Sequence, residues 1–276
     1  MSLLKSLCRS PSAIIGGVLL ILVLLMAALA GWLYPNDPLA LAGRPLQAPF
    51  SNPRFLFGTD SVGRDIIAQL FYGARTSLLV GITATAVAIV IGVLVGSIAG
   101  FYGGWVDTAL MRVTEAFQTV PNFILLLMLV VIFGSKIATL VVVIGIVSWT
   151  APARLTRAEF LTLRNREFVQ ACRVIGMPDW RIIFREILPN ALPPVIVYAS
   201  VVMAFSILLE SALAFLGLSD PNVASWGNLI ADGRRVLRSS WHVATLPGIA
   251  ILLTVLSISL IGQGLNDAMN PRLRRK

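Results

Sequence analysis

The segment from Arg154 to Glu186 is rich in charged side chains, most of them arginines. Seven arginines lie in it: Arg154, Arg157, Arg164, Arg166, Arg173, Arg181 and Arg185. Two short apolar patterns with helical spacing run between these arginines. A basic segment with amphipathic helices is typical of a folded surface that contacts a partner or a membrane.

Two sets of apolar residues in this segment have the spacing of a helix face. Each set occupies positions i, i+3, i+4 and i+7: Phe168, Ala171, Cys172 and Ile175, then Trp180, Ile183, Phe184 and Ile187. Gly176 follows the first set, where a left-handed helix C-cap favours glycine. Pro178 and Asp179 open the second set, where a fixed φ and a carboxylate suit a helix N-terminus. We expect a helix, a glycine turn and a second helix, with Pro189 just before the next membrane span.

Each of these predicted helices has one apolar face to bury. One helix can pack against the ends of the membrane helices, and the other suits a groove on a partner protein. The residues that flank this face are Arg164, Arg166, Glu167, Arg173 and Arg181. The alternative, in which both faces pack inside this chain, fits the spacing equally well. A DNA-binding helix-turn-helix fits less well, because the unit is tethered at both ends close to the bilayer.

Glu210 is the only charged residue inside the membrane spans predicted below. A carboxylate in a membrane is costly, so Glu210 could face a translocation pathway and contact a substrate amino group or a partner arginine. The alternative, favoured by its place near the outer interface, is a structural hydrogen bond between helices. The two cysteines, Cys8 and Cys172, and the single histidine, His242, make no metal-ligand pattern. We expect no catalytic residue and no metal site.

The elements that position these groups are predicted to be membrane helices. Apolar residues make up 57% of the chain and charged residues 13%, about half the charge of a soluble domain. A helix of roughly 20 apolar residues crosses a bilayer. We predict one all-α polytopic membrane domain, residues 1–276, with six spans at 13–33, 76–100, 117–135, 137–153, 191–217 and 247–266.

The distribution of Lys and Arg predicts how the spans are oriented. With the N-terminus inside the cell, the inner segments hold 14 of the 22 basic residues and the outer segments hold 8. Because basic residues favour the cytosolic side, we expect both termini there. The cytosolic loop is then 154–190, and the extracytoplasmic segments are 35–75 and 218–246. The apolar run from Ala13 to Leu33 is longer than a signal-peptide core, so we predict a retained span rather than cleavage after Ala30.

Two further patterns predict packing. Residues 66–74 have helical apolar spacing, and we expect them to form a helix on the outer membrane surface. Gly92, Gly96 and Gly100 recur every four residues, which puts three positions without side chains on one helix face. Such a face allows close contact with another helix, and we assign it to packing inside the chain.

Several motifs in the chain are similar to those of a known family. The run Gln170-Ala171-Cys172-x3-Gly176, with Leu188-Pro189 downstream, resembles the "EAA" loop of ABC importer permeases. Gln170, Cys172 and Glu186 stand where that loop has glutamate, alanine and isoleucine. Further stretches resemble the peptide/nickel-type permeases, in particular dipeptide and oligopeptide permease C: 57–65, 73–78, 103–107, 210–218 and 225–227. The C-terminal motif departs from the usual pattern at three positions: Gln263, Asn266 and Asn270.

The resemblance implies a type I ABC importer permease fold in the bacterial cytoplasmic (inner) membrane. It implies three kinds of partner: a homologous permease subunit, two cytosolic ATPases and an extracytoplasmic binding protein. The chain has no Gly-x4-Gly-Lys-Ser/Thr loop, so we expect ATP and Mg to bind on the partner ATPases and no cofactor to bind this chain. The predicted ATPase contacts are Arg166, Glu167, Gln170, Ala171, Cys172, Arg173, Gly176, Asp179, Trp180 and Arg181.

Other functional classes make different predictions. A channel or secondary transporter that works alone would carry polar residues through several spans, whereas only Glu210 is found. A membrane scaffold or sensor remains a third class. The net charge of +9 could indicate a nucleic-acid partner, but basic residues beside membrane spans are the commoner cause. Relatives of this type carry di- and oligopeptides, nickel, glutathione or opines, and we expect peptide.

Overall fold

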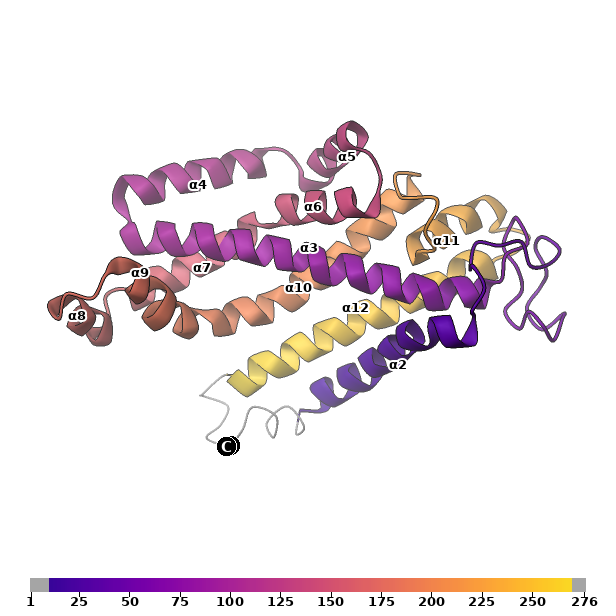
Figure 1. Cartoon of the computed structure of the whole chain (residues 1–276), viewed down its shortest axis with the longest axis horizontal. Helices are drawn as coiled ribbons and strands as arrows, with labels where there is room; N and C mark the ends of the chain where they lie inside the picture. The colour runs from indigo at the N-terminus through magenta and orange to yellow at the C-terminus, as the bar shows by residue number, and fades with distance from the viewer. Residues whose placement is uncertain (1–9, 270–276) are drawn as a thin grey trace.

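The computed structural model describes residues 10–269, and the regular elements among them are all helices (Figure 1). In chain order they are α2 (Pro11–Leu33), α3 (Ile66–Tyr102), α4 (Gly104–Thr119), α5 (Asn122–Phe133), α6 (Ile137–Ser148), α7 (Thr150–Leu163), α8 (Glu167–Val174), α9 (Asp179–Arg181), the π-helix η1 (Ile182–Ile187), α10 (Leu188–Phe215), α11 (Trp226–Gly233), the 3₁₀-helix η2 (Arg234–Val236) and α12 (His242–Met269). The predicted all-helical membrane fold is confirmed.

Four continuous helices are long and apolar enough to cross a membrane, and two bent helix pairs raise the number to six. The α4–α5 pair bends by 83° and the α6–α7 pair by 42°. The first bend falls at Val120 and Pro121, where proline removes a backbone donor and disfavours helix in the residue before it. The predicted spans 117–135 and 137–153 therefore correspond to short helices, α5 and α6, of 12 residues each. At 1.5 Å per residue each is about 18 Å long, too short to cross a bilayer without its neighbour.

The prediction of a separate helix on the outer membrane surface is wrong. Residues 66–74 form the first turns of α3, which runs without a break for 37 residues, or about 55 Å. The apolar face seen in the sequence is buried in the bundle, where Ile66 and Ala74 are fully covered and Leu70 nearly so. A hydrophobic face that packs against helices has the same periodicity as one that lies on lipid, so spacing alone does not separate the two.

The second helix predicted for the cytosolic segment is continuous with the span that follows Pro189. Residues Asp179–Phe215 form one helical run of 37 residues that contains η1. In η1 the hydrogen bonds shift to longer spacing, and the amide of Leu188 donates to the carbonyl of Ile183. A π-helical turn of this kind accommodates a proline in the following turn, because it changes which carbonyls need a donor. The expected loop 154–190 is therefore mostly helical and joins the next span directly.

The glycine stripe of α3 packs closely against α7. An added Cβ at Gly96 would lie 2.3 Å from the carbonyl oxygen of Ala153, and one at Gly100 would lie 2.5 Å from Cβ of Phe160. Gly92 is equally close to Pro152. The prediction that the stripe packs inside the chain is confirmed.

The two ends of the molecule differ in structure. Helix α11 lies at one end, together with the segment that precedes α3. Helices α8 and α9 lie at the other end (Figure 1). We call the first the loop end. The helices α2 and α12 run side by side with their described termini, Pro11 and Met269, directed away from the loop end. The basic residues Lys5 and Arg9, the thiol of Cys8 and the motif residues 270–272 lie outside the described part of the chain.

Candidate functional site

The site predicted from the sequence, residues 166–181, consists of α8, α9 and the turn between them, and we call it the elbow. The helix α8 ends in a Schellman turn. The amide of Met177 donates to the carbonyl of Cys172 at 3.0 Å, and that of Gly176 donates to the carbonyl of Arg173 at 3.0 Å. Gly176 has φ +75°, which confirms the predicted left-handed C-cap. The elbow is therefore a fixed turn and not a flexible linker.

The inner side of the elbow is anchored by a hydrophobic cluster at this end of the bundle. Val169 of α8 is fully buried, as are Ile182 and Ile187 of η1. They pack with Phe101 from the end of α3 and Phe160 from α7. This cluster joins the elbow to two long helices, so a force applied to the elbow acts on both.

The second predicted apolar stripe divides in the structure. Ile183 and Ile187 are buried, but Trp180 is 60% exposed and Phe184 is 45% exposed. The stripe was drawn with α-helical spacing, whereas the π-helix η1 rotates successive side chains by a different angle. Both apolar faces are partly packed inside the chain and partly exposed. The spacing had left open whether both faces pack inside the chain or one is free for a partner, and the structure lies between these alternatives.

The outer side of the elbow carries an unusual number of exposed apolar side chains. Val174 is 86% exposed, Ile175 is 74% and Phe168 is 39%. Sequence reasoning missed Val174, since it lies one position outside the stripe, yet it is one of the most exposed large apolar side chains in the described chain. An apolar surface on a rigid turn that also has a buried anchor is typical of a protein–protein contact.

The charged and polar residues predicted for the site surround this apolar surface, and all of them are exposed: Arg166, Glu167, Gln170, Arg173, Asp179 and Arg181. Two of the arginines lie over aromatic rings. The guanidinium of Arg173 lies 5.4 Å from the ring centre of Phe101, and that of Arg181 lies 5.3 Å from that of Trp180. The two arginines are thereby held beside the apolar surface while their donors stay free for a partner. Cys172 is half-buried against the cluster.

Glu210 lies apart from the elbow and inside the fold. Its side chain is buried, with a relative exposure of 1%, and the hydroxyl of Ser211 lies 3.4 Å from its carboxylate. Gly227 of α11 packs closely on α10, where an added Cβ would lie 2.6 Å from Cβ of Ala214 and in van der Waals contact with the Glu210 carboxylate, at 3.4 Å. Glu210 therefore lies at the contact between α10 and α11 and away from the elbow, and its hydrogen-bond partner Ser211 belongs to the same helix.

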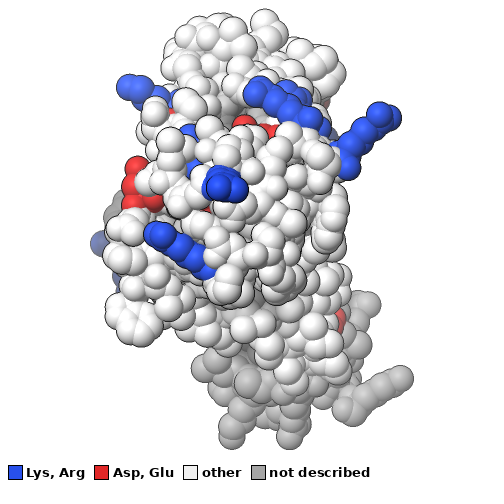
Figure 2. Space-filling model, turned by 90° about the vertical axis from the view of Figure 1, so that its right-hand side faces the viewer, with Lys and Arg blue, Asp and Glu red and all other residues white. Residues whose placement is uncertain are grey.

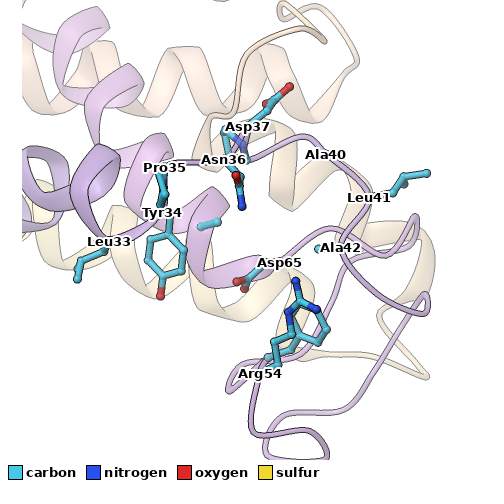
Figure 3. A pocket seen from close by; sticks show the side chains of 13 residues that line it. Leu33, Tyr34, Pro35, Asn36, Asp37, Ala40, Leu41, Ala42, Arg54 and Asp65 are labelled. Atoms are coloured by element: carbon cyan, nitrogen blue, oxygen red, sulfur yellow. The ribbon is translucent and has the colours of Figure 1, made fainter.

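The loop end carries a pocket of about 550 Å³ between the end of α2 and the segment before α3 (Figure 3). Tyr34, Arg54 and Asp65 line it. Asp65 is the N-cap of α3, and its carboxylate accepts a hydrogen bond from the amide of Ile67 at 2.9 Å. Burial raises the pKa of the Asp65 carboxyl, although this hydrogen bond acts in the opposite direction. Lys and Arg side chains are more prominent than Asp and Glu on the face seen from this end (Figure 2).

The helical bundle, its bent spans and the anchored elbow at one end define a polytopic membrane permease. The family model described as the binding-protein-dependent transport system inner membrane component matches residues 92–275. A second model, the N-terminal TM domain of oligopeptide transport permease C, matches residues 2–49. The chain belongs to this family of permease components of ABC importers, which work with an ATPase and a binding protein and are not themselves enzymes.

Named relatives cover nearly the whole chain. It is 41% identical to the dipeptide transport system permease protein DppC of Escherichia coli (strain K12), with 97% of this chain and 91% of the relative covered. It is 39% identical to the di/tripeptide transport system permease protein DppC of Pseudomonas aeruginosa (strain UCBPP-PA14), covering 98% and 91%. It is 35% identical to the glutathione transport system permease protein GsiD of Pectobacterium atrosepticum, covering 96% and 89%.

A solved structure shares the fold. The inward-facing MetNI methionine ABC transporter matches with a TM-score of 0.56 and 16% identity, over 73% of this chain and 97% of that chain. A likeness at this identity shows the fold alone. With the family established, the stand-alone channel, secondary transporter and scaffold hypotheses are set aside.

Proposed function

We propose that this chain is the permease subunit through which a bacterial importer moves di- or oligopeptides across the inner membrane. The family assignment gives the class of transporter, and the relatives that transport di-, tri- or oligopeptides support the choice of cargo. Glutathione, the cargo of another relative, is itself a small peptide. Nickel and opines are the alternatives within this type of permease.

The observation that carries the proposed mechanism is the exposed apolar surface of the elbow with its buried anchor. An ATPase subunit would cover Phe168, Val174 and Ile175, with the surrounding arginines and Glu167 as polar contacts. Covering such side chains favours binding by about 25 cal/mol for each Å² of apolar surface removed from water. ATP and Mg would bind on that ATPase and not on this chain.

The route from the elbow into the membrane is short. The helical run Asp179–Phe215 begins in the elbow and continues across the bundle. A shift of the elbow when the ATPases close would therefore tilt this run without an intervening loop. Glu210 lies near the far end of the run, so the helix links the ATPase surface to the α10–α11 contact.

The full assembly would contain a homologous permease as a heterodimer partner, two ATPases that bind the elbows, and a binding protein that docks at the loop end. In this arrangement the elbow and both termini face the cytosol. The positive surface at the loop end would face outward (Figure 2). We propose that the binding protein largely sets the specificity and that this chain supplies one half of the pathway.

Reconstitution tests the proposal. Proteoliposomes with the complete assembly should take up a labelled dipeptide only when ATP, the ATPases and the binding protein are all present. Mass spectrometry of the ligand that co-purifies with the binding protein identifies the cargo. Uptake by this chain and its permease partner without ATPases would contradict the proposed mechanism, and a co-purified metal or opine would contradict the proposed cargo.

A further inference from the structure

An ion pair joins two helices that the mechanism has not yet used. Arg157 of α7 and Asp107 of α4 form a bidentate contact, in which Nη2 of Arg157 lies 2.6 Å from Oδ2 of Asp107 and Nε donates to Oδ1. The Arg157 side chain is 32% exposed and that of Asp107 is 15% exposed. Two parallel hydrogen bonds between charged groups fix both distance and orientation, which a single contact does not.

The helix α4 has little else to hold it to this chain. Of its residues only Thr114 is buried. It starts at Gly104, directly after Gly103, and the φ values of +66° at Gly103 and +53° at Gly104 make a sharp reversal at the end of α3. Figure 1 shows α4 standing away from α3 after this reversal. A helix that leaves a two-glycine turn can pivot there, so the ion pair is the main polar restraint on its direction at this end.

The partner helix α7 is, by contrast, firmly fixed. The glycine stripe of α3 packs against it, and Arg164 at its end donates to the carbonyl of Gly100 at 3.1 Å. The chain then passes through only Asn165 and Arg166 before α8 begins. Arg157 is therefore attached to the same rigid unit that carries the elbow, whereas Asp107 belongs to the helix that pivots.

At the far end of α4 the contacts are weaker. Arg154 donates to the side-chain oxygen of Gln118 at 3.2 Å in an exposed position, and the rings of Phe117 and Trp149 meet at 5.5 Å. These contacts lie beside the 83° bend between α4 and α5. These contacts restrain the end of α4 near the bend, whereas the Asp107–Arg157 pair restrains its start.

We propose that the Asp107–Arg157 ion pair makes α4, and with it the bent span α4–α5, follow α7 when an ATPase moves the elbow. The two residues are positioning residues for transport and contact neither cargo nor nucleotide. This inference rests on the proposed function, since it needs an ATPase to move the elbow. It adds a second route from the elbow into the membrane, beside the continuous run Asp179–Phe215.

The test uses the complete importer in proteoliposomes and measures peptide uptake and ATP hydrolysis in the same sample. Asp107→Asn keeps the shape of the side chain and removes the charge. We expect it to lower uptake about tenfold, as is common when one partner of a hydrogen-bonded ion pair is removed, while ATP hydrolysis changes less than about twofold. The ATP used for each peptide should therefore rise. The exchange Asp107→Arg with Arg157→Asp should recover much of the lost uptake.

A second ion pair on the same helix is the matched control. Arg112 and Glu115 meet at 3.0 Å, but both side chains are exposed and both belong to α4. Glu115→Gln should leave uptake and the ATP used for each peptide unchanged. Unchanged coupling in Asp107→Asn would overturn the inference, as would an equal loss of uptake and hydrolysis, because a purely structural role lowers both together. The proposed function is judged separately, by whether uptake in the wild-type assembly depends on ATP.

Discussion

At the scale of single residues, several side chains hold backbone groups at helix ends near the membrane surface. Arg75 donates to the carbonyls of Ala27 and Ala28 in the last turns of α2, and Tyr72 donates to the carbonyl of Tyr34 at 2.9 Å. The carbonyls of Ala27 and Ala28 lie in the C-terminal part of α2, where a cation suits the helix dipole. At the start of α3, the carboxylate of Asp65 accepts a hydrogen bond from the amide of Ile67.

Variants of Asp65 can separate two contributions to stability: the stabilising N-cap hydrogen bond and the destabilising burial of the carboxylate charge. Because burial raises its pKa in the folded state, this carboxyl favours the fold at low pH, and that contribution is lost as pH rises through the raised pKa. Asp65→Asn keeps a cap acceptor without the charge, so its melting temperature should equal or exceed that of the wild type at about pH 8. This advantage should shrink as the pH falls through the raised pKa of Asp65, because the wild-type carboxyl then takes up a proton and loses its charge.

The comparison variant for this position is Asp65→Ala, which has no acceptor for the amide of Ile67. It should lower stability by about 1 kcal/mol at pH 8, the usual value of an N-cap. Thermal unfolding of the detergent-solubilised importer measures both variants. If the melting temperature of Asp65→Asn at pH 8 is as low as that of Asp65→Ala, the charge of Asp65 itself is needed for stability, which would contradict the prediction.

At the scale of elements, the sequence predicts long apolar helices well and their joints poorly. The runs near 13–33, 76–100, 191–217 and 247–266 lie within, or within two residues of, helices of the structure, because an apolar stretch of that length has no other stable form in lipid. The joints depend on contacts between distant residues. The bend between α4 and α5 has a local signal in Pro121, but the π-helix η1 packs against Phe101 of α3 and Phe160 of α7, which no local pattern records.

The elbow shows the same limit at closer range. Its glycine turn was predictable, since a left-handed residue after an amphipathic run has few alternatives to glycine. The division of its apolar residues into buried and exposed sets was not, because it depends on where Phe101 and Phe160 lie. The importance of Asp107 had only one signal in the sequence, its place in a stretch that resembles the family, and its partner Arg157 was one arginine among seven.

The packing of α3 on α7 gives a prediction for elements. Gly96→Ala would place a Cβ 2.3 Å from the carbonyl of Ala153, so one helix must move, at a typical cost of 1–3 kcal/mol, about that of overpacking a core. Gly17→Ala in α2 is the control, since nothing lies within 4 Å of the added atom. The first variant should lower the melting temperature of the solubilised importer and the second should leave it the same or higher. Equal effects would contradict the close contact.

At the scale of the whole molecule, two glycines at opposite ends of one helical run allow the site of force transfer to be tested. Gly176 in the elbow has φ +75° and Gly217 after α10 has φ +82°, and neither has an atom within 4 Å of an added Cβ. Leucine at either position meets the same backbone strain, about 1–2 kcal/mol, and the same open space. Any difference between the two variants therefore reports on where each lies and not on how well each folds.

Gly176→Leu should insert into the membrane normally and fail to retain the ATPase subunits on purification, because the new side chain and the altered turn displace the exposed surface of Val174 and Ile175. ATP-dependent uptake should then fall to background. Gly217→Leu should keep the ATPases at wild-type stoichiometry, since its position is at the end of the run away from the elbow. Co-purification measured by quantitative gel or mass spectrometry distinguishes the outcomes. If both variants lose the ATPases, strain anywhere along Asp179–Phe215 would be enough to release them, and the elbow would not be the specific contact. If neither does, the ATPase must bind elsewhere on the chain, and the exposed apolar surface would need another occupant.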